Sequence, residues 1–211
     1  MRIHGLYLIV DPEQTRGRDP MEVLGAALRG GASLVQYRDK LRDKGDQLPV
    51  AKAMLELCRR AGVPLLINDH VDVALAIGAD GVHVGQHDLP VDIARRLLPS
   101  GAVVGCSTNN ADEAKRAQAH GASYIAVGRI FPTGSKSNTR PASLDTIRQV
   151  KAAVSVPVVA IGGITAENVD QAIAAGADAA AVIAAVCAAE DVEAAARAIS
   201  SRFGRDVPGA L

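Results

Sequence analysis

Polar and charged side chains occupy alternate positions in the segment "LVQYRDK", residues 34–40. It begins with apolar residues, as a buried strand does, and Gln36, Arg38 and Lys40 then follow two positions apart. In an extended strand this spacing directs an amide, a guanidinium and an ammonium group toward one face. Such a row of cations suits an anion such as pyrophosphate. A solvated strand edge is the alternative interpretation.

Two carboxylates follow the next two apolar runs. Asp69 comes directly after "PLLIN" (64–68), and Asp88 comes shortly after "GVHVG" (81–85). Each could simply cap the helix that follows it. At neighbouring strand ends, however, the pair suits a hard cation such as Mg²⁺, which takes one or two carboxylates together with phosphate oxygens. The sequence therefore predicts a magnesium site at Asp69 and Asp88.

Further groups that could bind anions follow the later apolar runs. Ser107 ends one run, and the polar, basic segment "PTGSKSNTRP" contains Lys136, which could close over an anion. The turn "AIGGITAEN" places Gly162 and Gly163 before a helix that we expect to begin after Thr165. Backbone N–H groups at such a turn bind phosphate well. A glycine pair that only turns the chain is the alternative.

The histidines and cysteines give weaker signals. His83 and His87 are four residues apart, but they straddle a strand end and no third zinc ligand is evident. Cys58, Cys106 and Cys187 are scattered, which indicates reduced thiols in a cytoplasmic protein. We interpret Cys106 as a buried apolar residue rather than a nucleophile. No Ser–His or Cys–His pair is evident from the spacing.

The elements that must position these groups alternate along the chain. Eight strand-like runs occupy residues 6–10, 34–38, 64–68, 81–85, 103–107, 124–128, 157–161 and 180–184. Helix-forming segments separate them, and glycines that can end a helix precede several runs. This predicts a single (β/α)₈ TIM barrel over residues 1–211, with a frayed tail at 204–211 and its functional groups at the carboxyl ends of the strands. The alternative is an open doubly wound sheet, but no G-x-G-x-x-G follows the first run.

Composition excludes several classes of function. The 211 residues are 48% hydrophobic and 22% charged, as in a globular domain. Basic and acidic residues number 23 each and aromatic residues make up only 2%, so we expect no nucleic-acid partner. No apolar run approaches the ~20 residues that cross a bilayer, so we expect no membrane partner. The oligomeric state, a homo-oligomer included, stays open.

Four segments in order resemble the thiamine phosphate synthase family. They are "VQYRDK", "LLINDHVDVALAIGADGVHVGQHD", "GRIFPTGSK" and "VVAIGGITAENV", and they span most of the chain. The resemblance implies a (β/α)₈ transferase that joins hydroxymethylpyrimidine pyrophosphate to thiazole phosphate. The implied mechanism is dissociative and assisted by Mg²⁺, and it gives thiamine phosphate and pyrophosphate.

The resemblance also implies a role for individual residues. Those implied to hold the pyrimidine pyrophosphate and its Mg²⁺ are Gln36, Arg38, Lys40 and Asn68, with Asp69 and Asp88 as metal ligands. Those implied to act on the departing pyrophosphate are Ser107 and Lys136, together with Arg38. Those implied to hold the thiazole phosphate are Thr133, Ser135, Gly163 and the backbone near Ile183 and Ala184.

The chain departs from the family pattern at three positions. Asn109 stands where many members have His, Ala184 where Ser is frequent, and Ser135 where Thr is frequent. The first two departures affect contacts to the thiazole substrate. A thiazole tautomerase-like isomerase is an alternative, but such proteins use the His that Asn109 replaces and tend to lack "GVHVGQHD". A sensor of thiamine precursors without catalytic activity is the second alternative.

Overall fold

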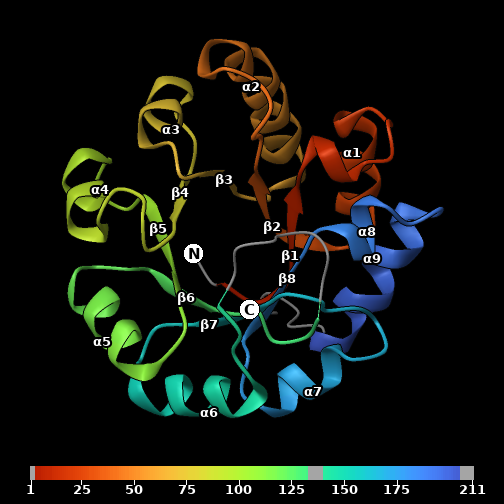
Figure 1. Ribbon diagram of the computed structural model, residues 1–211. Coiled ribbons are helices and arrows are strands. Elements are labelled where there is room, and N and C mark those ends of the chain that lie inside the picture. The colour runs from red at the N-terminus through yellow and green to blue at the C-terminus, as the bar shows by residue number, and fades with distance from the viewer. Residues whose placement is uncertain (1–2, 133–139, 205–211) are drawn as a thin grey trace, which may run out of the picture.

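Eight parallel strands form a closed barrel in the computed structural model, which describes residues 3–132 and 140–204 (Figure 1). The strands follow one another in sequence order around the ring, and the last pairs with the first. They are β1 (Gly5–Val10), β2 (Ala32–Tyr37), β3 (Leu65–Asn68), β4 (Gly81–Val84), β5 (Val103–Thr108), β6 (Tyr124–Val127), β7 (Val158–Ile161) and β8 (Ala179–Val182). The closed ring confirms the predicted (β/α)₈ barrel and excludes the open doubly wound sheet.

Helices surround the barrel and connect successive strands (Figure 1). The α-helices are α1 (Pro20–Arg29), α2 (Lys44–Ala61), α3 (Val71–Ile77), α4 (Val91–Leu97), α5 (Ala111–Ala119), α6 (Leu144–Ala153), α7 (Val169–Ala174), α8 (Ala184–Cys187) and α9 (Val192–Ser200). Two 3-10 helices, η1 (Pro12–Gln14) and η2 (Ser201–Phe203), complete the set. Within the described ranges, none of these helices has both the length and the apolar character needed to span a membrane.

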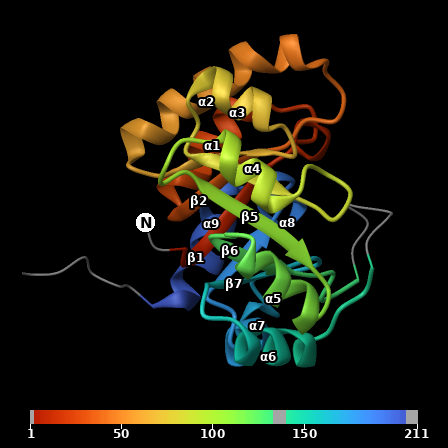
Figure 2. The same cartoon turned by 90° about the vertical axis from the view of Figure 1, so that its left-hand side faces the viewer.

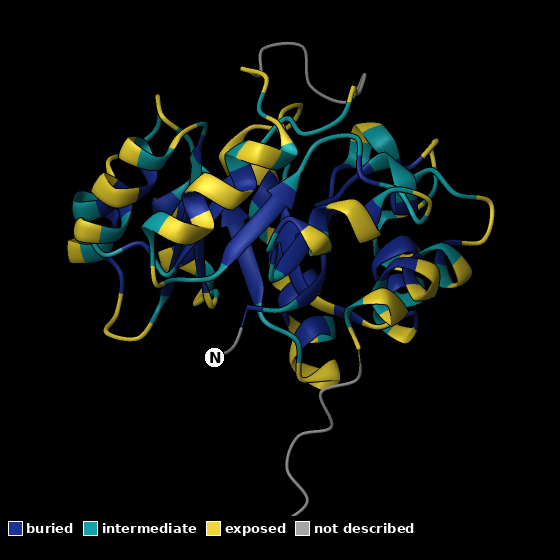
Figure 3. Cartoon of the chain, turned by 90° about the horizontal axis from the view of Figure 1, so that it is seen from below, coloured by how far each residue is buried: buried dark blue, intermediate teal, exposed yellow. Residues whose placement is uncertain are grey.

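The strands are buried on both faces, so their side chains divide into two layers. In β1, Leu6, Leu8 and Val10 pack in the outer layer against the helices, while Tyr7 and Ile9 belong to the cluster inside the barrel. This is the period of two that a strand imposes. Figure 3 shows the result: buried strands at the centre and exposed residues on the outer faces of the helices. Strands buried on both faces explain the nearly continuous apolar runs of the sequence.

All strands run in one direction, so their carboxyl ends meet at one end of the barrel. Figure 2 shows the arrow of β5 pointing away from the end at which the chain begins. We call the end formed by the carboxyl ends of the strands, with the loops that follow them, the barrel mouth. In folds of this type the mouth carries the functional groups.

The first and last parts of the described chain meet at the opposite end from the mouth. The Nε2 atom of His4 lies 3.0 Å from the carbonyl oxygen of Phe203, and the two rings meet edge to face with centroids 5.7 Å apart. The backbone N–H of Gly5 donates to the carbonyl oxygen of Asp178 at 3.1 Å, just before β8. The two ends of the described chain thus lie together, beside the place where β8 pairs with β1.

Candidate active site

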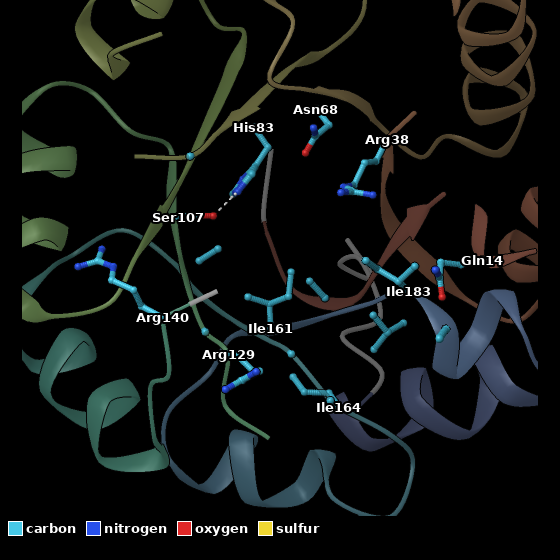
Figure 4. A pocket seen from close by; sticks show the side chains of 18 of the residues that line it. Gln14, Arg38, Asn68, His83, Ser107, Arg129, Arg140, Ile161, Ile164 and Ile183 are labelled. Atoms are coloured by element: carbon cyan, nitrogen blue, oxygen red, sulfur yellow. Dashed lines mark hydrogen bonds between the residues drawn. The ribbon is translucent and has the colours of Figure 1, made fainter. Parts of the chain in front are cut away.

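A cavity of about 880 Å³ opens at the barrel mouth. This volume lies within the range typical of sites for small molecules. The predicted site residues that line it are Arg38, Lys40, Asn68, Asp69, Asp88, Ser107, Gly163, Ile183 and Ala184. Figure 4 shows Arg38, Asn68, His83 and Ser107 on one side of the cavity and Ile161 and Ile164 on another. Thr133, Ser135 and Lys136 lie outside the described residues.

The cavity has two walls of different character. The wall that we call the charged wall follows strands β2 to β5 and consists of Arg38, Lys40, Asn68, Asp69, Asp88 and Ser107. The wall that we call the glycine wall follows strands β7 and β8 and consists of Gly162, Gly163, Ile164, Ile183 and Ala184. The first offers side-chain charges, and the second offers mainly backbone and small or apolar side chains.

The cations of the charged wall are held by carboxylates. A guanidinium nitrogen of Arg38 pairs with Asp11, and the side chains are only 15% and 1% exposed, respectively. The Nζ atom of Lys40 lies 2.6 Å from the Oδ2 atom of Asp69. A solvated strand edge is therefore the wrong interpretation of Arg38. Gln36 lies deeper, buried inside the barrel, and does not line the cavity.

The two carboxylates of the predicted metal site lie together and cap no helix. The N-caps of α3 and α4 are His70 and Pro90, and no side chain forms a capping hydrogen bond at either. Asp69 and Asp88 instead lie beside each other in the cavity, and each carboxyl shifts the pKa of the other. The Oδ2 atom of Asp88 also accepts from the backbone N–H of Gly85 at 2.7 Å. Capping is thus the wrong interpretation of both.

The carboxyl pair shares its charge unequally. Burial opposes ionisation of Asp69, but hydrogen bonds to Lys40 and Asp88 and the charge of Lys40 outweigh it and lower the pKa of Asp69. Burial, followed by the hydrogen bond and the charge of Asp69, raises the pKa of Asp88. Asp88 therefore keeps its proton to a higher pH than an ordinary carboxyl does, whereas Asp69 ionises at a lower pH than usual. A cation held by the two residues would compete with protonation of Asp88.

The position of Asp69 depends on an unusual backbone conformation. Its φ is 60°, in the left-handed region that residues other than glycine rarely adopt. The backbone N–H of Asp69 donates to the carbonyl oxygen of His83 at 2.8 Å, which ties the end of β3 to β4. Non-glycine residues in this region concentrate at functional sites, where surrounding structure holds them.

A Ser–His contact that the spacing did not reveal lies at the base of the charged wall. The Nε2 atom of His83 is 2.8 Å from the Oγ atom of Ser107, as the dashed line in Figure 4 marks. The Nδ1 atom of His83 is 2.8 Å from the hydroxyl of Tyr124. Both ring nitrogens thus have partners within the protein.

Cys106, beside Ser107, is buried, and burial raises the pKa of its thiol to about 11, which confirms its interpretation as an apolar residue.

The glycine wall is built on two residues with positive φ, Gly162 at 101° and Gly163 at 65°. A Cβ atom on Gly163 would lie 2.5 Å from the carbonyl oxygen of Pro132, so the close approach requires glycine.

The prediction that a helix begins after Thr165 is wrong, because α7 begins at Val169. The side chain of Asn168 explains the delay: its Oδ1 accepts from the N–H of Thr165 at 2.8 Å and its Nδ2 donates to the carbonyl oxygen of Gly163 at 2.9 Å.

Comparison with known proteins places this architecture in a family. Residues 6–186 match the family described as thiamine monophosphate synthase. The chain belongs to this family. It is 48% identical to the thiamine-phosphate synthase of Methanocella arvoryzae, over 92% of each chain, and 49% identical to that of Chloroflexus aurantiacus, over 91% of this chain and 89% of the relative. The thiamine phosphate pyrophosphorylase from Pyrococcus furiosus superposes with a TM-score of 0.87 at 35% identity, covering 94% of this chain and 95% of the other.

Membership of the thiamine monophosphate synthase family confirms the resemblance seen in the four segments. It makes the protein a transferase of thiamine biosynthesis. The names of these relatives also favour a synthase over the tautomerase-like isomerase.

The departure at Asn109 has a structural explanation. The Nδ2 atom of Asn109 donates to the carbonyl oxygens of Gly128 at 2.7 Å and Arg140 at 3.0 Å. The guanidinium of Arg140 pairs with both carboxylate oxygens of Glu113 at 2.9 Å. Asn109 and Glu113 thus fix both ends of the segment between β6 and α6, a task that the sequence does not reveal.

A further cation of the cavity, Arg129, was not among the predicted site residues. Arg129 lines the cavity beside the glycine wall, close to Ile161 and Ile164 in Figure 4. It lies within the quoted segment "GRIFPTGSK". A basic residue directly after an expected strand at 124–128 was the signal that could have identified it.

Proposed function

We propose that this protein is a thiamine-phosphate synthase that condenses hydroxymethylpyrimidine pyrophosphate with thiazole phosphate and releases pyrophosphate. The observation that carries the proposal is the neighbouring carboxyls of Asp69 and Asp88, beside the cations Lys40 and Arg38, in the cavity of a barrel of this family. The charged wall then takes the pyrophosphate of one substrate, and the glycine wall takes the phosphate of the other.

The carboxyl pair fits a magnesium ion. Asp69 and Asp88 supply the hard oxygen ligands that Mg²⁺ prefers, and a cation would compete with the proton that the raised pKa of Asp88 favours. Such an ion, when bound, stabilises negative charge on a phosphate leaving group. Lys40, now paired with Asp69, lies where it can contact the same phosphate oxygens.

The remaining residues of the charged wall act on the leaving group. In a dissociative reaction, charge develops on the departing pyrophosphate, so fixed donors and cations aimed at it accelerate the reaction. Arg38, held by Asp11, and the hydroxyl of Ser107 supply such groups, and by resemblance Lys136 adds another. The cationic pyrimidine that remains is captured by the thiazole nitrogen held beside it, which is catalysis by proximity.

The glycine wall supports a site for the thiazole phosphate. The turn at Gly162 and Gly163 and the segment at Ile183 and Ala184 line the cavity, and backbone N–H groups of such segments can hold a phosphate. Loops after the seventh and eighth strands and a short extra helix, here α8, form phosphate sites in many barrels.

The three buried thiols, Cys58, Cys106 and Cys187, support a place in the cytoplasm.

The proposal is tested by turnover. The purified protein is incubated with both phosphorylated precursors and Mg²⁺, and thiamine phosphate and pyrophosphate are measured. We expect both products in equal amounts, and none when either precursor or the metal ion is omitted. Tight binding of both precursors without product would instead indicate a sensor, and isomerisation of the thiazole precursor alone would indicate an isomerase.

A further inference from the structure

A line of hydrogen bonds crosses the interior of the barrel beneath the cavity, from Gln36 to Ser107. The Nε2 atom of Gln36 donates to the hydroxyl of Tyr7, which lies 2.8 Å from the hydroxyl of Tyr124. The Tyr124 hydroxyl lies 2.8 Å from Nδ1 of His83, and Nε2 of His83 lies 2.8 Å from Oγ of Ser107. The five residues come from β2, β1, β6, β4 and β5 in that order. The first four are at most 8% exposed.

One direction of bonding lets every buried hydroxyl of this line donate to the next residue, and it runs from the amide of Gln36 to Ser107. Tyr7 accepts from Gln36, so its single proton is available for Tyr124. Tyr124 accepts the hydrogen bond from Tyr7, and its own hydroxyl donates a hydrogen bond to Nδ1 of His83. A neutral imidazole whose Nδ1 accepts carries its proton on Nε2, which then donates to Ser107. Burial raises the pKa of Tyr7 and of Tyr124, so both phenols keep the protons that this order requires.

We propose that this line holds His83 as the neutral Nε2–H tautomer and thereby turns the hydroxyl proton of Ser107 into the cavity. Tyr124 and His83 are then positioning residues for Ser107. The proposal rests on the proposed function in one respect: the group that receives the Ser107 proton is an anionic phosphate oxygen.

The direction of the line excludes a nucleophilic role for Ser107. A histidine that activates a serine must accept the hydroxyl proton on the nitrogen that faces it. In the proposed direction the nitrogen facing Ser107 carries the proton, because Nδ1 accepts from Tyr124. Ser107 therefore accepts from His83 and donates to an anion, which is the arrangement that stabilises a leaving pyrophosphate.

Packing holds the central tyrosine in place. The ring of Tyr124 stacks on that of His83 with centroids 5.6 Å apart and an angle of 24°. It meets Tyr7 edge to face at 5.9 Å. A Cβ atom on Gly105 would lie 2.1 Å from Cζ of Tyr124, so the ring fills the space that a side chain would otherwise take. The phenylalanine variant can keep this ring position and lose only the hydroxyl.

The first test is the Tyr124→Phe variant in turnover assays. Loss of the donor to Nδ1 frees His83 to adopt either tautomer, and Ser107 loses its fixed direction. We expect kcat to fall about tenfold while KM for both substrates changes little, because Ser107 itself remains and the effect concerns the transition state. Tyr37→Phe is the matched control: it removes another buried phenol, which donates to Asp39 at 2.8 Å outside this line, and should leave kcat unchanged.

The second test reads the tautomer directly, by ¹⁵N NMR of the histidine rings at neutral pH. We expect Nε2–H for His83 in the wild-type protein and a mixture in Tyr124→Phe. His83→Gln, whose amide can still donate to Ser107, should retain more kcat than His83→Leu, which cannot. An Nδ1–H tautomer in the wild type, or equal kcat in the Gln and Leu variants, would overturn the proposal. The NMR result stands whether or not the protein turns over, so it separates this inference from the proposed function.

Discussion

The two walls of the cavity differ in the chemical groups that they offer to a ligand. On the charged wall, Arg38 and Lys40 are already paired with Asp11 and Asp69, so recognition of an anion there means exchanging one set of charges for another. On the glycine wall, Gly163 has no side chain, and the carbonyl oxygen of its turn is already bonded to the side chain of Asn168. One wall depends on charge, and the other depends on shape.

This difference determines what each wall tolerates. A change of charge on the charged wall leaves a partner carboxylate or cation unpaired, and this is costly where the groups are buried. A change of volume on the glycine wall displaces backbone, because a Cβ atom on Gly162 would lie 2.8 Å from Cα of Arg129. Substitutions of charge and of volume should therefore have opposite patterns of effect on the two walls.

The largest effect should come from Asp88→Ala on the charged wall. Loss of a ligand that holds the charge-stabilising metal ion should lower turnover by ~10²-fold or more. Turnover at saturating Mg²⁺ and the melting temperature are measured together. Asp72→Ala is the control, since it removes an exposed carboxylate that pairs with Lys44 and accepts from the backbone N–H of Val73. Full Mg²⁺-dependent activity of Asp88→Ala would show that the metal assignment is wrong.

The charged wall should also make metal binding depend on pH. The pKa of Asp88 is raised, so a proton stays on it at pH values where an ordinary carboxyl is ionised, while the lowered pKa keeps Asp69 ionised. Below the pKa of Asp88, Mg²⁺ affinity should fall by about tenfold for each pH unit, and above it the dependence should vanish.

Calorimetric titrations with Mg²⁺ in two buffers of different ionisation enthalpy measure this linkage. About one proton should be released for each ion bound below the pKa of Asp88. Asp88→Asn removes the competing proton and should give weak affinity without pH dependence. An affinity of the wild-type protein that does not change with pH would contradict the raised pKa of Asp88.

On the glycine wall, Gly163→Val should raise KM for the thiazole phosphate by roughly tenfold, with KM for the pyrimidine pyrophosphate unchanged. The added side chain would meet the carbonyl oxygens of Phe131 and Pro132 and push the turn away from the cavity. Gly101→Val is the matched control, because Gly101 also has positive φ but has open space around it. A rise confined to the pyrimidine substrate would mean that the two phosphate sites are assigned the wrong way round.

The smallest effect should come from Ala184→Ser, which restores the hydroxyl frequent in the family. A hydroxyl added beside an anion that backbone donors already hold should contribute at most ~1 kcal/mol, about a fivefold fall in KM for the thiazole phosphate. Ala188→Ser, at the other end of α8, should leave KM unchanged. A fall far beyond fivefold would show that the backbone of the glycine wall binds phosphate weakly.

The barrel could be predicted because its strands are buried on both faces. Each of the eight apolar runs overlaps an observed strand, from β1 to β8, and its two ends lie within two residues of the ends of that strand. The carboxylates and cations of the charged wall were also predicted, since each lies at the end of such a run or within three residues after it. Arg38, Asp69 and Asp88 then had to meet at one end of a parallel barrel.

Contacts that depend on register or on local side chains could not be predicted. His83 and Ser107 are separated by 24 residues, and they meet because β4 pairs with β5 so that His83 lies opposite Gly105, two residues before Ser107. The predicted start of α7 was wrong, because the side chain of Asn168 hydrogen-bonds back to the turn and the helix begins later. Gln36 was expected in the cavity but lies in the buried layer below it, since β2 ends at Tyr37.

The contact between His4 and Phe203 has a consequence for rearranging this chain. Because β8 also pairs with β1, the described barrel is a ring of eight units with no structural first member. A short peptide could join its two ends, and a cut at the exposed turn around Gly101, at the end opposite the mouth, would give new ends far from the cavity. Circular permutation at that turn should thus preserve both walls, since the folded ring contains the same strand pairs whichever unit comes first in the chain.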